Sequence, residues 1–135
     1  MTATKGTFIN RGAQKYLTVK TAVINIDNGS GTTLDDILLY CVNDVFLVDA
    51  NVVYTEATDT AGVASANVKI GTTAGGAEIV TATALAVSKA VGATTALTLN
   101  LHYVAAGTTI RVRHTGIAST EAGQYFVQLR YFNEP

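Results

Sequence analysis

Few residues of this chain have side chains suited to catalysis. The 135 residues include two histidines, one cysteine, one methionine and no tryptophan. Cys41 lies in the apolar run 37–42, where a thiol stays protonated and unreactive, so we expect a buried structural cysteine. No Gly-x-Ser-x-Gly motif supplies a serine nucleophile. We therefore predict that the chain is not an enzyme.

The two histidines lack the neighbours that a transition-metal site needs. His114 alternates in phase with Ile110 and Val112, which places it at the edge of a predicted core. His102 is out of phase with the leucines around it and is expected to face solvent or a partner. Neither has a second His or Cys at ligand spacing. The sequence predicts no transition metal and no cofactor.

Two loops have residues that can bind ions in other proteins. Asp27, Asn28 and the pair Asp35–Asp36 could hold calcium through carboxylates and carbonyls, but no twelve-residue calcium loop is present, and a solvated acidic loop is the favoured interpretation. The glycine-rich segment 71–76 lacks the Gly-Lys-Ser/Thr ending of a phosphate loop and is interpreted as a hairpin turn.

The elements that must position these residues are predicted to be strands. Thr is the commonest residue, and it occurs with many Val, Ile and Tyr, which fit a pleated surface better than a helix. Runs of alternating apolar and polar residues are separated by turns rich in Gly, Asn and Asp. We expect about eight strands, near 17–26, 37–42, 46–56, 63–70, 77–83, 96–103, 108–114 and 124–132.

Three of these segments have a specific expected geometry. In 17–26 the apolar residues change phase after Val23, which predicts a β-bulge. In the strand 46–56 one face is predicted to contain Phe46, Val48, Ala50, Val52 and Tyr54. The segment 83–91 is compatible with a short helix, but extended structure is favoured because the helix would be isolated among strands.

The fold class predicted by this pattern is all-β. We expect a single antiparallel β-sandwich domain, jelly-roll-like, over residues 16–135, preceded by an extended N-terminal arm over residues 1–15. No run approaches the roughly 18 apolar residues that span a bilayer, so no membrane segment is expected. The net charge of −1 provides no basic field for nucleic acid.

Charge is unevenly distributed along the chain. Residues 1–26 contain four bases and no acid, whereas residues 27–59 contain seven acids and no base. The arm could dock on an acidic surface of a neighbour or partner; alternatively, each charge is simply solvated. The residues assigned to a binding arm are Lys5, Phe8, Arg11 and Lys15.

Charged residues make up only 14% of the chain, well below the roughly 25% typical of soluble domains. The segment 37–42 is apolar on both faces, and the last strand has aromatic residues and an arginine on its second face. Such surface favours an oligomer interface, although an ordinary core strand is equally compatible with either segment alone. The interface residues predicted are Leu38, Tyr40, Phe126, Arg130 and Phe132.

Two stretches resemble small structural proteins of tailed bacteriophages: ANVKIGTTAGGAEIVTATALAVSKAVGATTALTL (66–99) and AAGTTIRVRHTGIASTEAGQYFVQLRY (105–131). The nearest resemblance is to capsid decoration (cement) proteins with a jelly-roll fold, and it covers roughly residues 16–132. It implies a homotrimer made in the host cytoplasm that sits on the capsid exterior of the virion and ties neighbouring major capsid proteins together. The alternative is a phage tail or fibre module that recognises a cell-surface glycan.

Overall fold

The computed structural model describes residues 16–58, 66–118 and 123–133. The arm predicted over residues 1–15 lies outside the described residues and stays a prediction. All regular structure in the described part is β-strand. These residues contain no helix that is long and apolar enough to cross a membrane. The strands are β1 Leu17–Lys20, β2 Ile24–Asn25, β3 Thr33–Tyr40, β4 Val45–Glu56, β5 Asn67–Gly71, β6 Val80–Ala84, β7 Thr94–Leu97, β8 Tyr103–Val104, β9 Thr109–Thr115 and β10 Gln124–Asn133.

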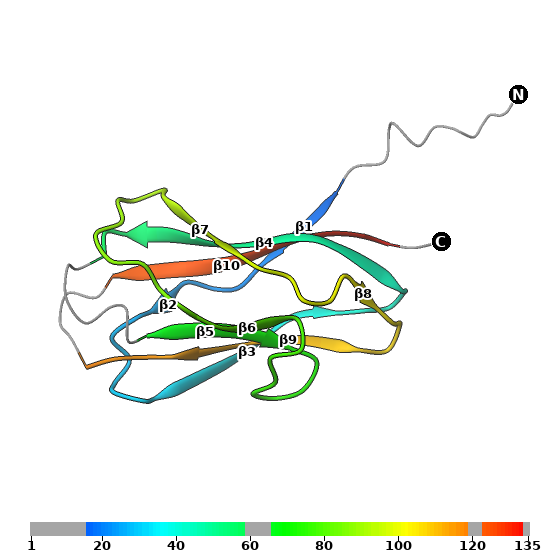
Figure 1. Cartoon of the computed structure of the whole chain (residues 1–135), viewed down its shortest axis with the longest axis horizontal. Helices are drawn as coiled ribbons and strands as arrows, with labels where there is room; N and C mark the ends of the chain where they lie inside the picture. Colours follow the sequence, from blue (N-terminus) through cyan, green and yellow to red (C-terminus); the bar gives the residue numbers. More distant parts are fainter. Residues whose placement is uncertain (1–15, 59–65, 119–122, 134–135) are drawn as a thin grey trace, which may run out of the picture.

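The strands form two sheets that face each other as a β-sandwich (Figure 1). The larger sheet has the order β1-β10-β4-β7, with β2 also pairing β10 and β8 also pairing β4. The smaller sheet has the order β3-β9-β5-β6. If β1 with β2 and β7 with β8 are each counted as one interrupted strand, the described chain has two four-stranded sheets with jelly-roll order. The predicted all-β, antiparallel sandwich is confirmed.

The apolar core lies between the two sheets. The strands β5, β9 and β10, and β4 after its bulge, contribute alternate side chains to it, as the period of two requires. In β9, for example, Ile110, Val112 and His114 are buried, whereas the residues between them are only partly covered. The outer faces of the two sheets therefore present the other half of each strand to solvent.

The bulge predicted in the first strand is present between β1 and β2. The Thr21 N–H donates to the Val127 carbonyl oxygen, and the Thr21 hydroxyl oxygen accepts the Val127 N–H. Ile24 then lies opposite Tyr125. Three steps on this strand thus match two on β10, so one extra residue is accommodated at 22–23. As a result Ile24 and Ile26 are buried and Val23 is exposed.

The face predicted for the strand 46–56 is wrong at its start. Ala50, Val52 and Tyr54 are buried as expected, but Phe46 lies on the outer face. The cause is a register shift opposite β10: Asp49 pairs with Arg130 and Leu47 with Tyr131, which leaves Val48 as an extra residue. The side chains before this bulge therefore have the opposite phase to those after it.

A third bulge, in β3, explains why the segment 37–42 is apolar on both faces. Ile37 lies opposite Arg111 and Leu39 opposite Ile110, so Leu38 is the extra residue. Leu38 is only 3% exposed and belongs to the core. Its assignment to an oligomer interface is therefore wrong, whereas Tyr40 is 56% exposed.

Two other boundaries differ from expectation. The strand expected over 96–103 is interrupted, because β7 ends at Leu97 and β8 begins only at Tyr103. In β8 the Val104 side chain faces the core, and Tyr103 is exposed. The segment 83–91 contains no helix; β6 ends at Ala84 and an irregular connection follows. The glycine-rich segment 71–76 lies in the connection between the paired strands β5 and β6, as predicted.

Candidate functional site

The outer face of the larger sheet has a row of stacked rings. Tyr16, Phe132, Phe46 and His102 follow one another across the sheet, and we call these four residues the aromatic row. Their centroids are 6.0 Å apart for Tyr16 and Phe132, 5.3 Å for Phe132 and Phe46, and 5.7 Å for Phe46 and His102. Interplanar angles of 17–25° show that the rings stack on one another.

Strand register brings these residues together from distant parts of the chain. Phe132 of β10 lies directly opposite Phe46 of β4, and the β4 bulge places Phe46 on the outer face. Tyr16 precedes β1, whose Leu17 pairs with Tyr131. The ring of His102 is held by a hydrogen bond of 3.0 Å between its Nδ1 and the Leu47 carbonyl oxygen. Two members of the row thus lie in the paired strands β4 and β10, and the other two directly precede β1 and β8.

An ion pair lies beside the row. The Arg130 guanidinium donates hydrogen bonds through Nε to both carboxylate oxygens of Asp49, at 2.9 and 3.1 Å, and through NH2 to Oδ2. This carboxylate holds the pKa of Arg130 above its usual value. The guanidinium also lies over the Tyr16 ring, 5.6 Å from its centroid. Arg130 is therefore held against Asp49 and Tyr16 on the outer face of the sheet.

The same face continues along β1 and β10 with a second cation–ring contact. The ammonium of Lys20 lies 5.1 Å from the centroid of the Phe126 ring. The face as a whole combines aromatic rings, one arginine and few free charges. That composition is typical of the buried core of protein interfaces.

Ring orientation limits what the row can bind. Phe132 lies between Tyr16 and Phe46, and Phe46 lies between Phe132 and His102. The inner rings therefore have neighbours against their faces, and a sugar ring needs a free aromatic face for stacking. The ring edges remain available to apolar side chains of another protein.

Three of the five predicted interface residues come together on this face: Phe126, Arg130 and Phe132. Tyr40 lies opposite Thr109 in the smaller sheet, on the other side of the sandwich. Tyr16 and Phe46 were not predicted from the sequence. The bulge in β4 reverses the phase of Phe46, and only the alternation in β10 indicated an aromatic outer face. The predicted arm residues Lys5, Phe8, Arg11 and Lys15 lie outside the described residues.

The acidic stretch of the sequence does not form one acidic surface in the described part. Asp49 is paired with Arg130 on one outer face, and Asp35 with Arg113 on the other. Asp44 lies in the turn between β3 and β4, where the Ala106 N–H donates to it at 2.8 Å and lowers its pKa. No group of three potential metal ligands occurs among the described residues.

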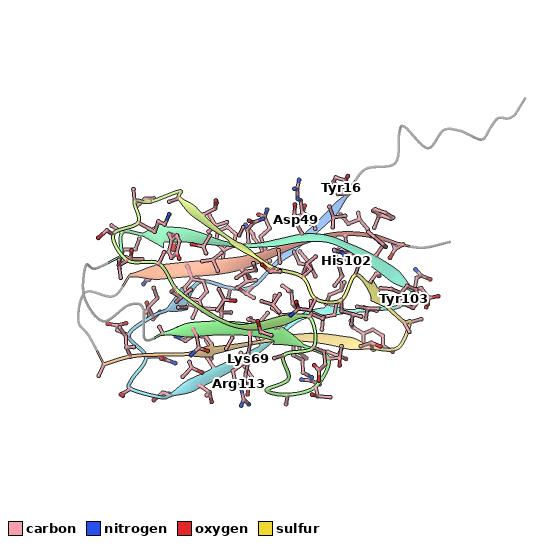
Figure 2. All side chains as sticks on the ribbon, viewed as in Figure 1. Tyr16, Asp49, Lys69, His102, Tyr103 and Arg113 are labelled. Carbon is pink, nitrogen blue, oxygen red and sulfur yellow. The ribbon has the colours of Figure 1, made fainter. Side chains whose placement is uncertain are left out.

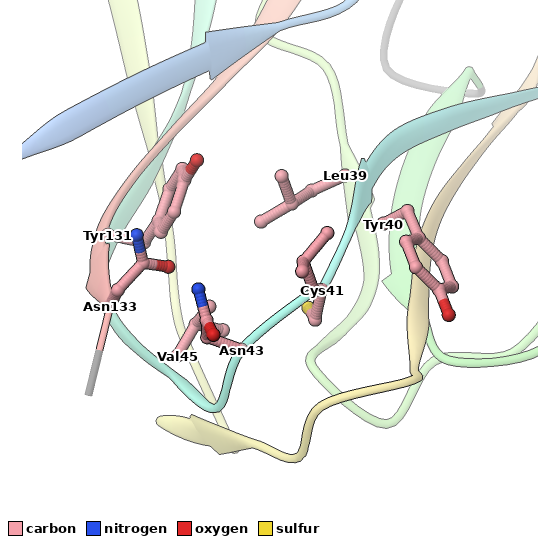
Figure 3. A pocket seen from close by; sticks show the side chains of 8 residues that line it. Leu39, Tyr40, Cys41, Asn43, Val45, Tyr131 and Asn133 are labelled. Carbon is pink, nitrogen blue, oxygen red and sulfur yellow. The ribbon is translucent and has the colours of Figure 1, made fainter. Parts of the chain in front are cut away.

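Two side chains that can titrate, Cys41 and His114, are buried in the core. Cys41 is buried, as predicted, and this burial raises the pKa of its thiol. His114 is fully buried and bonded to the Tyr125 hydroxyl, deeper than the core edge predicted for it. A cavity of about 170 Å³ between β3, β4 and β10 is lined by Cys41 with apolar and amide groups (Figure 3).

Comparisons with known proteins do not place the chain in a family: no family model matches it, and neither curated proteins nor solved structures give a significant match.

Proposed function

We propose that this chain is a non-enzymatic structural protein of a bacteriophage particle, a decoration protein that binds the outside of the head as a homotrimer. The observation that carries the proposal is the aromatic row on an outer sheet face, together with Phe126 and Arg130. Apolar rings beside a fixed arginine are suited to contact between subunits. The resemblance of residues 16–132 to capsid decoration proteins supports the same role.

In this proposal the subunits associate through the larger sheet, and residues 1–15 bind the major capsid protein. Stabilisation of the shell then follows from mass action. A protein that binds only the assembled shell stabilises it by RT ln(1 + [L]/Kd). Three linked attachment points raise the effective affinity without any new kind of contact. No covalent chemistry is required of the chain.

Deleting residues 1–15 tests this division of labour. We expect the deleted chain to sediment as the same trimer as the full chain but to lose binding to particles stripped of the protein. A full-length variant with Lys5, Arg11 and Lys15 changed to Gln separates the contribution of charge from that of length. Unchanged particle binding after the deletion would remove the arm from the proposal. Binding to a glycan array, with no binding to particles, would replace it with the glycan-recognition alternative.

A further inference from the structure

The outer face of the smaller sheet has a cluster of cations. Arg113 on the central strand β9 lies opposite Lys69 of β5 on one side and Asp35 of β3 on the other. Arg111 is two residues earlier on the same face, opposite Ile37 and Gly71. We call Lys69, Arg111 and Arg113 the basic cluster. Figure 2 shows Lys69 and Arg113 on the side of the sandwich away from Tyr16 and Asp49.

The carboxylates nearby balance only part of this charge. Asp35 accepts hydrogen bonds from Arg113 Nε at 2.6 Å and NH2 at 2.8 Å, and this contact lowers the pKa of Asp35. Arg111 and Lys69 enter no ion pair within the described residues. Three cations thus face one carboxylate on this part of the sheet.

Two other carboxylates in this region are already engaged. The Glu78 carboxylate accepts the Thr72 N–H at 2.9 Å. Asp36 accepts the Ile37 N–H at 2.9 Å and is on a strand position opposite the inward-facing Val112. Both carboxylates keep their negative charge, but neither forms an ion pair with the basic cluster within the described residues.

Apolar side chains flank the cluster on the same face. Ile37 lies opposite Arg111, and Tyr40 lies opposite Thr109, two residues before Arg111 on β9. The side chains of Ile37 and Tyr40 are each more than half exposed. Arginine beside tyrosine and an aliphatic residue is a combination enriched in protein interfaces. Nucleic acid fits less well, because two or three cations supply little phosphate affinity and the whole chain has a net charge of −1.

We infer that the basic cluster, with Ile37 and Tyr40, is a second docking surface, and that its partner is a carboxylate-rich protein surface with apolar side chains. Charge complementarity identifies the partner, since an acidic patch of similar size would pair with Arg111 and Lys69. The inference does not depend on the proposed function, because this surface is on the opposite sheet from the aromatic row. A chain with two such faces can bridge unlike neighbours.

Titration of the full-length, ¹⁵N-labelled chain with a decaglutamate peptide tests this inference. We expect amide shifts confined to β5, β9 and the adjoining part of β3 at about 50 mM salt, and their loss at about 500 mM salt. A peptide that alternates Glu with Leu should bind several-fold more tightly, because Ile37 and Tyr40 then gain contacts. Shifts centred on the aromatic row, or tighter binding of a short DNA duplex, would overturn the inference.

Matched charge variants complete the test. The double variant Lys69→Gln/Arg111→Gln should lose decaglutamate binding. The single variants Lys69→Gln and Lys89→Gln are a matched pair that removes one charge each: the first should weaken binding, and the second, which lies elsewhere, should keep it. Equal loss in both variants would mean that only net charge matters, which contradicts a defined surface. The unperturbed part of each spectrum reports whether the variant is folded.

Discussion

His114 and Tyr125 form a polar contact inside the sandwich. The Tyr125 hydroxyl lies 2.6 Å from His114 Nδ1, and both side chains are fully buried. Burial lowers the pKa of His114 from its ordinary 6.5 and outweighs the opposing effect of the Ile26 backbone. Burial also raises the pKa of Tyr125. The pair is therefore held neutral near pH 7.

This contact predicts that stability falls in mild acid. The unfolded chain protonates His114 near pH 6.5, whereas the folded chain resists protonation to lower pH. Below pH 6.5 the unfolded state binds more protons, so the free energy of unfolding decreases by up to about 1.4 kcal/mol per pH unit. Urea unfolding between pH 7.5 and 5 measures this slope, and His114→Phe should flatten it. An identical slope in that variant would contradict the assignment.

Removal of the Tyr125 hydroxyl should by itself lower the free energy of unfolding. Tyr125→Phe leaves a buried imidazole nitrogen without its partner, and we expect a loss of about 1–3 kcal/mol in the free energy of unfolding. Tyr40→Phe is the matched control, because Tyr40 is exposed, and it should change stability by less than about 0.5 kcal/mol. Denaturant unfolding at pH 7.5 compares the two. Similar small losses in both would mean that the hydrogen bond is not important for folding.

At the scale of the strands, the bulge in β3 separates adjacent residues into different environments. Leu38 is in the core, whereas Ile37 beside it is 56% exposed. Leu38→Ala should therefore cost about 2–5 kcal/mol, because it leaves a cavity, and Ile37→Ala should cost less than about 0.5 kcal/mol. Chemical unfolding of the two variants tests the register directly. A larger loss for Ile37→Ala would place the bulge elsewhere.

Alternation within the long strands could be predicted from the sequence, but the bulges in β3 and β4 could not. The first strand revealed its bulge because Ile24 and Ile26 break the phase of earlier apolar residues. Phe46 and Val48 keep the same phase as Ala50, so the bulge there has no signal in hydrophobicity. It is determined by pairing with β10, where Asp49 meets Arg130 and Leu47 meets Tyr131. Register of this kind depends on a partner strand distant in sequence.

At the scale of the whole molecule, the sandwich has two different outer faces. The larger sheet presents the aromatic row, and the smaller sheet presents the basic cluster (Figure 2). The sequence predicted part of the first face through Phe126, Arg130 and Phe132. Tyr16, Phe46 and His102 could not be added, because only the strand order β1-β10-β4, with β8 beside β4, brings them into one row with Phe132. The distribution of charge along the sequence was likewise a poor guide, since folding disperses the acids.

The proposed homotrimer requires contact between copies of this chain through the aromatic row. Analytical ultracentrifugation tests it most directly, with the full chain, the row variant Phe46→Ser/Phe132→Ser and the control Val87→Ser/Val91→Ser, which removes two exposed apolar side chains elsewhere. We expect three times the 14.1 kDa chain mass for the full chain and the control, and a monomer for the row variant. A monomeric full chain, or a row variant that stays trimeric, would contradict it.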